Sequence, residues 1–334
     1  MKFKISAVTK NVKIPDRIEL IEEAECEKGD VVLVKVKSKE SFIKYIRSPE
    51  AEKLYIKKGD VFLSALSDRY ATRVLEGKVP ERLKKGDTIN LLEQGGTSGA
   101  VISARADFIP LELEFLGFLS ERGRKVNIKD FAIDVLEIKK EPKLVISVGA
   151  NMESGKTTTT AGLVEGLVKA GYSACGGKIT GIGNVNDIMS YKKKGAKLVY
   201  GIIDAGFPST ANLSIDELED VFMRIFSNLA SANPDFIVLE IADGILQRET
   251  SMLLKSKVVN RCRPEFVLSC NDALGAYGGK MYLKEKFGVV PVIICGLGTI
   301  TALGRKEIED ITKIKAFDPV TQSKEMAEYL LKNV

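Results

Sequence analysis

Histidine is absent from the 334 residues of this chain, and its absence removes several classes of catalytic site. Without an imidazole, a serine–histidine–aspartate triad, a cysteine–histidine pair and a histidine-ligated zinc or iron site are all excluded. Any proton transfer must therefore use carboxylates, lysine or the substrate itself.

Cysteine is sparse as well. The five cysteines form no C-x-x-C pair, and they stand at positions 26, 175, 262, 270 and 295. This scatter is typical of reduced thiols in a cytoplasmic protein rather than of a disulfide framework. Cys270 lies in a polar segment, but no histidine is present to activate it, so a reactive thiol is disfavoured there.

Long apolar runs are also missing. No segment approaches the roughly 20 apolar residues of a membrane span, and residues 1–6 lack the apolar core of a signal peptide. We therefore expect a cytoplasmic protein with no membrane partner. With 50 basic against 45 acidic side chains, the charge balance gives no indication of nucleic-acid binding.

The length suggests two domains. In the first part, turns of the form E/K-K-G-D precede short β-branched or aromatic runs at residues 27–30, 57–60 and 84–87. This pattern favours strands. We predict a smaller, mainly β domain, a barrel or a sandwich, over residues 1–140, with a role as a lid or in substrate selection. Residues 48–54 are predicted to form a short helix.

The second part alternates apolar runs with helical patterns. A capping box at Ser214 and Glu217 predicts the start of one helix, and five apolar runs suit buried parallel strands. We predict an α/β domain over residues 141–334, with a mostly parallel sheet and helices on both faces. Such sheets bind nucleotides at the carboxyl ends of their strands.

The most specific motif is A-N-M-E-S-G-K-T at residues 150–157, between an apolar run and a helical pattern. It matches the phosphate-binding P-loop, with alanine in place of the first glycine. Backbone N–H groups and the helix N-terminus would surround a phosphate, and Lys156 would add a full positive charge. The residues predicted to bind nucleotide here are Ala150, Asn151, Met152, Glu153, Ser154, Gly155, Lys156, Thr157 and Thr158.

Two further segments carry a family resemblance. Lys178 stands in G-K-I-T-G, and Glu240 ends the run D-F-I-V-L-E. These segments resemble K-P-x-x-[ST]-G and D-L-V-L-V-E-G-A-G-G of dethiobiotin synthetase, a P-loop enzyme grouped with cobyrinic acid synthases and nitrogenase-iron-protein-like ATPases. Ile179 replaces the family proline and Ile241 a family glycine. The resemblance covers only the C-terminal half of the chain.

The resemblance implies catalytic roles for Lys156 and Lys178. It also implies that Mg²⁺ is held by Thr157, one aspartate and Glu240, which are oxygen ligands of the kind magnesium requires. We choose Asp204 as the aspartate because it follows an apolar run, and Asp187 is its competitor. An acid at the end of a strand can instead be a turn former or helix cap, and a solvated lysine is the ordinary alternative for Lys178.

Asn271 follows another apolar run, together with Asp272. Related P-loop proteins use an asparagine near this point for adenine, so we assign Asn271 to the nucleotide. The guanine-specific N-K-x-D pattern is absent, which favours ATP over GTP.

Three functions are compatible with these motifs. The preferred one is a Mg²⁺- and ATP-dependent enzyme that transfers the γ-phosphoryl group to a small carboxylate or carbamate, giving an acyl phosphate for an amine to capture. The second is a nucleotide-dependent switch or chaperone acting on a protein partner. Many such proteins act as dimers, so a homodimer is one alternative for this chain. The third is a transferase that binds a coenzyme phosphate on a P-loop fold.

Overall fold

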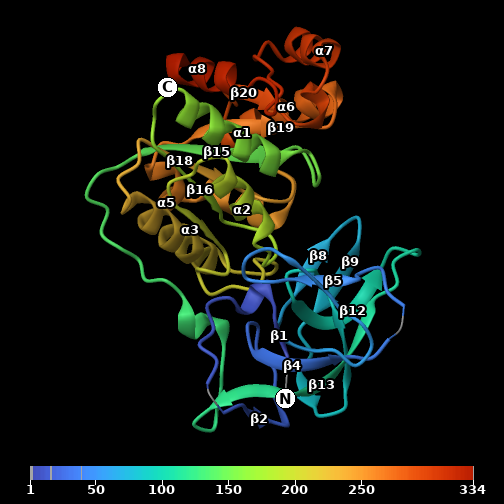
Figure 1. Cartoon of the computed structure of the whole chain (residues 1–334). Helices are drawn as coiled ribbons and strands as arrows, with labels where there is room; N and C mark the ends of the chain where they lie inside the picture. The colour runs from blue at the N-terminus through green and yellow to red at the C-terminus, as the bar shows by residue number, and fades with distance from the viewer. Residues whose placement is uncertain (1–2, 16, 39, 334) are drawn as a thin grey trace. The chain divides into compact units, whose positions relative to one another are not determined.

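The computed structural model describes residues 3–15, 17–38 and 40–333. The chain divides into two compact units (Figure 1). The β unit comprises the chain up to Ile133 with two later segments, Ile182–Asn186 and Ile202–Asn212. The α/β unit comprises Asp134–Gly181, Asp187–Gly201 and the chain from Leu213 onward. The division predicted at residue 140 did not include the two later segments.

A ring of five strands forms the centre of the β unit. They are β4 (Val31–Val36), β7 (Val61–Leu66), β11 (Thr88–Leu91), β12 (Thr97–Ala104) and β13 (Leu111–Glu121). The order β7-β4-β13-β11-β12 uses antiparallel pairs, and a parallel pairing of β12 with β7 closes the ring. The barrel-like architecture predicted for this part of the chain is confirmed.

Shorter elements surround this ring. The strands are β1 (Lys4–Ile5), β2 (Glu19–Ile21), β3 (Glu23–Glu25), β5 (Tyr45–Arg47), β6 (Lys53–Tyr55), β8 (Arg69–Ala71), β9 (Leu75–Lys78), β10 (Arg82–Lys84) and β14 (Arg124–Lys125), and the 3₁₀ helices are η1 (Ala7–Thr9) and η2 (Ile128–Phe131). The helix predicted at residues 48–54 is wrong. Ser48 Oγ instead accepts hydrogen bonds from the N–H groups of Glu50 and Glu52 in the β5–β6 turn.

The three E/K-K-G-D segments share one turn geometry, as predicted. In each, the glycine has a positive φ of 90° to 98°, which glycine adopts without steric cost. In each, the aspartate carboxylate accepts a hydrogen bond from the N–H group three residues earlier, at 2.7 to 3.1 Å. The glycine and aspartate pairs are Gly29 and Asp30, Gly59 and Asp60, and Gly86 and Asp87. The turns lead into β4, β7 and β11.

The α/β unit contains a six-stranded sheet in which every pairing is parallel, in the order β17-β16-β18-β15-β19-β20. Its strands are β15 (Lys143–Gly149), β16 (Ala174–Lys178), β17 (Val199–Gly201), β18 (Phe236–Glu240), β19 (Glu265–Ser269) and β20 (Ile293–Cys295). The predicted parallel sheet is confirmed.

The helices of this unit are α1 (Lys156–Lys169), α2 (Asn186–Lys193), α3 (Ile215–Ala230), α4 (Arg248–Lys255), α5 (Lys257–Arg261), α6 (Ala273–Phe287), α7 (Ala302–Thr312), α8 (Ser323–Asn333) and the 3₁₀ helix η3 (Leu297–Thr299). They cover both faces of the sheet (Figure 1). In β16, Gly176 abuts Tyr191 of α2, whereas Gly177 abuts Ile225 and Leu229 of α3. Side chains alternate across a strand, so α2 and α3 lie on opposite faces. None of the helices in the described residues is long and apolar enough to cross a membrane.

Helix α3 begins at the predicted capping box. Ser214 Oγ accepts a hydrogen bond from Glu217 N at 3.2 Å, and Glu217 Oε2 accepts one from Ser214 N at 2.9 Å. The apolar stripe of this helix, which runs from Leu218 to Leu229, is buried.

We expect Ser214→Ala to lower the free energy of unfolding by about 1 kcal/mol, because the substitution leaves an N–H group at the start of α3 without its partner. Urea unfolding followed by circular dichroism measures this difference. Lys332→Ala, at an exposed position of α8, is the control and should change stability by less than about 0.5 kcal/mol. Equal stability of Ser214→Ala and the parent would contradict the cap.

Candidate nucleotide site

The predicted P-loop lies between the central strand β15 and helix α1. β15 ends at Gly149, its neighbours are β18 and β19, and α1 begins at Lys156. The loop therefore stands at the carboxyl edge of the parallel sheet, where α/β proteins bind ligands. Strand, loop and helix are arranged as predicted, and the chain has the architecture of a P-loop nucleotide-binding protein.

Backbone conformation shapes the loop. Glu153 and Gly155 both have positive φ, 58° and 92°. A glycine is required at 155 for a second reason, since a Cβ there would lie 3.0 Å from Gly296 Cα. Left-handed residues turn successive N–H groups toward a common point, which is how backbone amides form an anion-binding concavity.

Alanine replaces the usual first glycine, and the structure accommodates its methyl group. Cβ atoms built on Gly275 and Gly279 of α6 would lie 3.9 and 3.6 Å from Ala150 Cβ, which is ordinary van der Waals contact. The methyl group of Ala150 is therefore bordered by two glycines of α6, which leave room for it. This local packing explains why the A-x-x-x-x-G-K-T variant keeps the geometry of the loop.

Lys156 folds back over the end of β15. Its Nζ donates to the carbonyl of Asn151 at 2.9 Å, and only 6% of the residue is exposed. A Cβ on Gly149 would lie 2.7 Å from this Nζ and would also collide with Ser154 Oγ. Burial lowers the pKa of Lys156, and the nearby charge of Glu240 opposes this effect only in part.

Two buried polar groups in the loop have no side-chain partner among the described residues. Within the described residues, no carboxylate forms a salt bridge with Lys156, and Ser154 Oγ has no hydrogen-bond partner. Both groups lie beside Gly149. Buried polar groups are nearly always paired, so an ammonium and a hydroxyl left together indicate a site for an anion.

Glu240 is the centre of the hydrogen-bond network beside the loop. It ends β18, and 2% of the residue is exposed. Its Oε1 accepts a hydrogen bond from Thr157 Oγ1 at 3.2 Å and lies 3.7 Å from Lys178 Nζ. Its Oε2 accepts a hydrogen bond from the hydroxyl of Tyr191. Thr157, Lys178 and Glu240, all predicted from the sequence, are therefore brought together.

Lys178 ends β16, directly opposite Glu240 in the sheet register. Its ammonium forms a salt bridge with Asp187 of α2. Burial by itself would lower the pKa of Lys178, but Asp187 and Glu240 outweigh burial and raise the pKa above its ordinary range. The two acids thus favour the charged form of Lys178.

The two candidate magnesium ligands, Asp204 and Asp187, belong to different units of the structure. β17 ends at Gly201, and Asp204 belongs to the β unit, where it pairs with Lys10 at 2.7 Å and accepts a hydrogen bond from Asn11 at 3.1 Å. Asp187 is the acid that the structure brings to Lys178. Asp204 as a magnesium ligand stays a prediction, and the contacts within the α/β unit favour its competitor.

Thr157 and Glu240 are suited to hold a magnesium ion that has only one or two protein ligands. Their hard oxygen atoms lie 3.2 Å apart beside the P-loop. The described residues contain no group of three or more histidine, cysteine, aspartate or glutamate side chains arranged to hold a metal. Magnesium typically takes one or two protein ligands and completes its shell with phosphate and water, so the donor set suits a nucleotide-bound ion.

Asn271 follows β19, and its Oδ1 is buried with no hydrogen-bond partner. A free acceptor is what an amino group of a base would need, but its role with adenine stays a prediction. Asp272, next to it, caps α6 by accepting a hydrogen bond from Gly275 N at 2.6 Å.

Sequence reasoning identified neither Tyr191 nor Asp243 as a site residue. Tyr191 lies one helical turn after Asp187, and this i, i+4 spacing was the only available signal. Asp243 stands in a D-G pair, a pattern typical of an ordinary turn. It has a positive φ of 66°, and its negative charge favours the charged forms of Lys156 and Lys178. The local pattern does not distinguish this aspartate from an ordinary turn residue.

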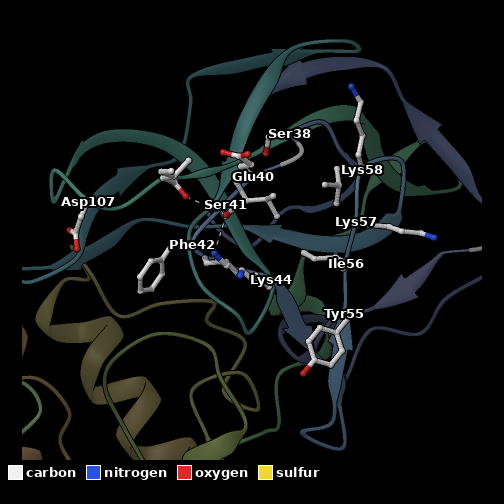
Figure 2. Close-up of a pocket in the computed structure, with 14 residues that line it drawn as sticks. Ser38, Glu40, Ser41, Phe42, Lys44, Tyr55, Ile56, Lys57, Lys58 and Asp107 are labelled. Atoms are coloured by element: carbon white, nitrogen blue, oxygen red, sulfur yellow. Dashed lines mark hydrogen bonds between the residues drawn. The ribbon is translucent and has the colours of Figure 1, made fainter.

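A hollow with a volume of about 1070 Å³ lies within the β unit (Figure 2). The rings of Phe42 and Tyr55 border it and are largely exposed. Lysines and acids share the lining with them, among them Lys44, Lys57 and Asp107. This mixture provides no arrangement comparable to the P-loop network.

No protein-family model matches the chain, and no curated protein matches it. Similar solved structures include the signal recognition particle 54 kDa protein from Aeropyrum pernix K1 in complex with GDP, with 19% identity and a TM-score of 0.39 over 59% of this chain and 50% of that one. A DUF1611 family protein from Anabaena variabilis has 15% identity and a TM-score of 0.40 over 60% and 61%. FtsY from Thermotoga maritima has 18% identity and a TM-score of 0.36 over 60% and 63%.

The chain therefore spans about half to two thirds of the length of these structures. At such identities and scores the likeness carries no inference about activity. The resemblance to dethiobiotin synthetase in particular remains a prediction.

Gly149→Ala should weaken nucleotide binding at least about tenfold, because the added methyl group displaces Lys156 Nζ and Ser154 Oγ from the end of β15. Isothermal titration calorimetry measures the affinity. Gly278→Ala on α6 is the matched control, since no atom lies within 4 Å of its added Cβ, and it should bind as the parent does. Unchanged affinity in Gly149→Ala would argue against the loop as the phosphate site.

Proposed function

We propose that this protein is a magnesium- and ATP-dependent enzyme that transfers the γ-phosphoryl group of the nucleotide to a small carboxylate or carbamate. The observation that carries the proposal is the buried P-loop pair, Lys156 and Ser154, which has no partner among the described side chains. A nucleotide phosphate provides the negative charge and the acceptor oxygen atoms that both groups require.

The surrounding charges support phosphoryl transfer. Lys156 and Lys178 supply two cations, and Thr157 and Glu240 supply oxygen ligands for magnesium, whose chemistry when bound is to neutralise phosphate charge. Enzymes of this kind act mainly by positioning and by electrostatic stabilisation. The two lysines have different partners. Lys178 forms a salt bridge with Asp187 and lies near Glu240, whereas Lys156 forms no salt bridge among the described residues and is available to a ligand.

The acceptor class follows from the resemblance and from the missing histidine. A carboxylate is ionised at neutral pH, so its oxygen can attack the γ-phosphorus without a general base. A new oxygen–phosphorus bond forms as the bond to the β,γ-bridging oxygen breaks, ADP leaves, and the acyl phosphate can then be captured by an amine. We assign selection of the acceptor to the β unit and the adenine contact to Asn271.

Lys156→Ala should weaken ATP binding by about 10- to 100-fold, because a charge-assisted hydrogen bond to phosphate is lost. The thermal midpoint of the nucleotide-free protein should not fall, since burial already disfavours the charged lysine. Fluorescence titration with a labelled nucleotide and differential scanning calorimetry test these outcomes. Lys169→Ala is the control on the same helix, because Lys169 lies on the surface and pairs only with Glu165 among the described residues. Parent-like binding by Lys156→Ala would refute the proposal.

The reaction class is tested by phosphate release from ATP in the presence of Mg²⁺. We expect slow turnover alone and stimulation by a small carboxylate together with an amine, with ATP preferred over GTP. Stimulation only by a protein partner would instead identify a switch or chaperone. Coenzyme binding with no phosphate release under any condition would identify a transferase.

A further inference from the structure

Tyr191 is a fully buried side chain whose only polar atom points at the nucleotide site. The residue comes from α2 and has an exposed fraction of 0%. Its hydroxyl donates to Glu240 Oε2. A tyrosine hydroxyl is protonated at neutral pH, so it can donate this hydrogen bond.

The sheet is built to admit this ring. A Cβ on Gly176 of β16 would lie 2.9 Å from Tyr191 Cβ, closer than real Cβ atoms approach. A glycine inside a strand lowers the stability of the folded state by about 0.5 to 1 kcal/mol relative to alanine. Phenylalanine would fill almost the same volume without a buried hydroxyl, so packing alone does not account for tyrosine at this position.

The hydrogen bond from Tyr191 gives the two carboxylate oxygens of Glu240 different partners. Oε2 is held by the tyrosine, and this leaves Oε1 directed at Thr157 Oγ1, 3.2 Å away. Oε1 also lies 3.7 Å from Lys178 Nζ, a cation that would attract a carboxylate free to rotate. Holding one oxygen therefore keeps the other beside Thr157 instead of allowing a closer ion pair with Lys178.

We propose that Tyr191 is a positioning residue for magnesium at the nucleotide site: it holds the Glu240 carboxylate so that Oε1 and Thr157 Oγ1 are presented together as oxygen ligands. This inference rests on the proposed function. Residues that orient a metal ligand through a hydrogen bond commonly change metal affinity by 10- to 100-fold when they are removed. The phosphate contacts of the P-loop do not pass through Tyr191, so nucleotide binding without magnesium is independent of it.

The test uses Tyr191→Phe, which keeps the ring and removes only the hydroxyl. The affinity for a fluorescent ATP analogue is measured in EDTA and then during a Mg²⁺ titration. We expect the Mg²⁺ concentration for half-maximal effect to rise about tenfold, with affinity in EDTA within about twofold of the parent. Tyr172→Phe is the matched control, because Tyr172 is 40% exposed and its ring packs edge-on against Phe236. It should titrate as the parent does.

The outcomes separate this inference from the proposed function. A parent-like Mg²⁺ titration for Tyr191→Phe, alongside a clear effect of Mg²⁺ on the parent, overturns the positioning role alone. Equal losses with and without Mg²⁺ also overturn it, because they show a structural defect, which thermal unfolding of the variant would register. A parent protein that binds no nucleotide overturns the proposed function, and one that binds without any response to Mg²⁺ overturns the metal site and the role of Tyr191 with it.

Discussion

The burial of the Lys156 ammonium beneath the P-loop is the constraint on which the rest of the site depends. A charged group removed from water must be compensated, and one loop carbonyl, that of Asn151, supplies only part of the compensation. The loop can enclose the lysine only because Gly149 leaves room for it and Gly155 allows the backbone to pass close to Gly296. Gly149 and Gly155 therefore allow the Lys156 ammonium to be buried beneath the loop, and this positive charge favours an anionic ligand.

The two lysines of the site differ because their surroundings differ. Lys178 has Asp187 in a direct salt bridge and Glu240 close by, and its pKa is raised. Lys156 is influenced by acids only from a greater distance, and its pKa is lowered by burial. The two cations at one sheet edge thus differ in their partners. Acids of the protein pair with Lys178, whereas Lys156 forms no salt bridge among the described residues, as suits the phosphate binding that we propose.

Local features of the site could be predicted from the sequence, and long-range ones could not. The strand–loop–helix around Lys156 and the cap at Ser214 depend on neighbouring residues, so their patterns identify them. The choice between Asp187 and Asp204 depends on where β17 ends and on Lys10, 194 positions away from Asp204 in the chain. Both aspartates lie between the Lys178 segment and the next predicted helix, and this position alone does not separate them.

The pair Gly176 and Gly177 shows why the role of Tyr191 was hidden. In a sequence, G-G-K is typical of a flexible turn, but here both glycines lie inside β16 and face opposite sides of the sheet. One admits the ring of Tyr191, and the other admits Ile225 and Leu229 of α3. The close approach of α2 brings the tyrosine hydroxyl to Glu240 on the adjacent strand. Gly176 therefore determines which side chain reaches the carboxyl edge of the sheet, and only the three-dimensional packing reveals this effect.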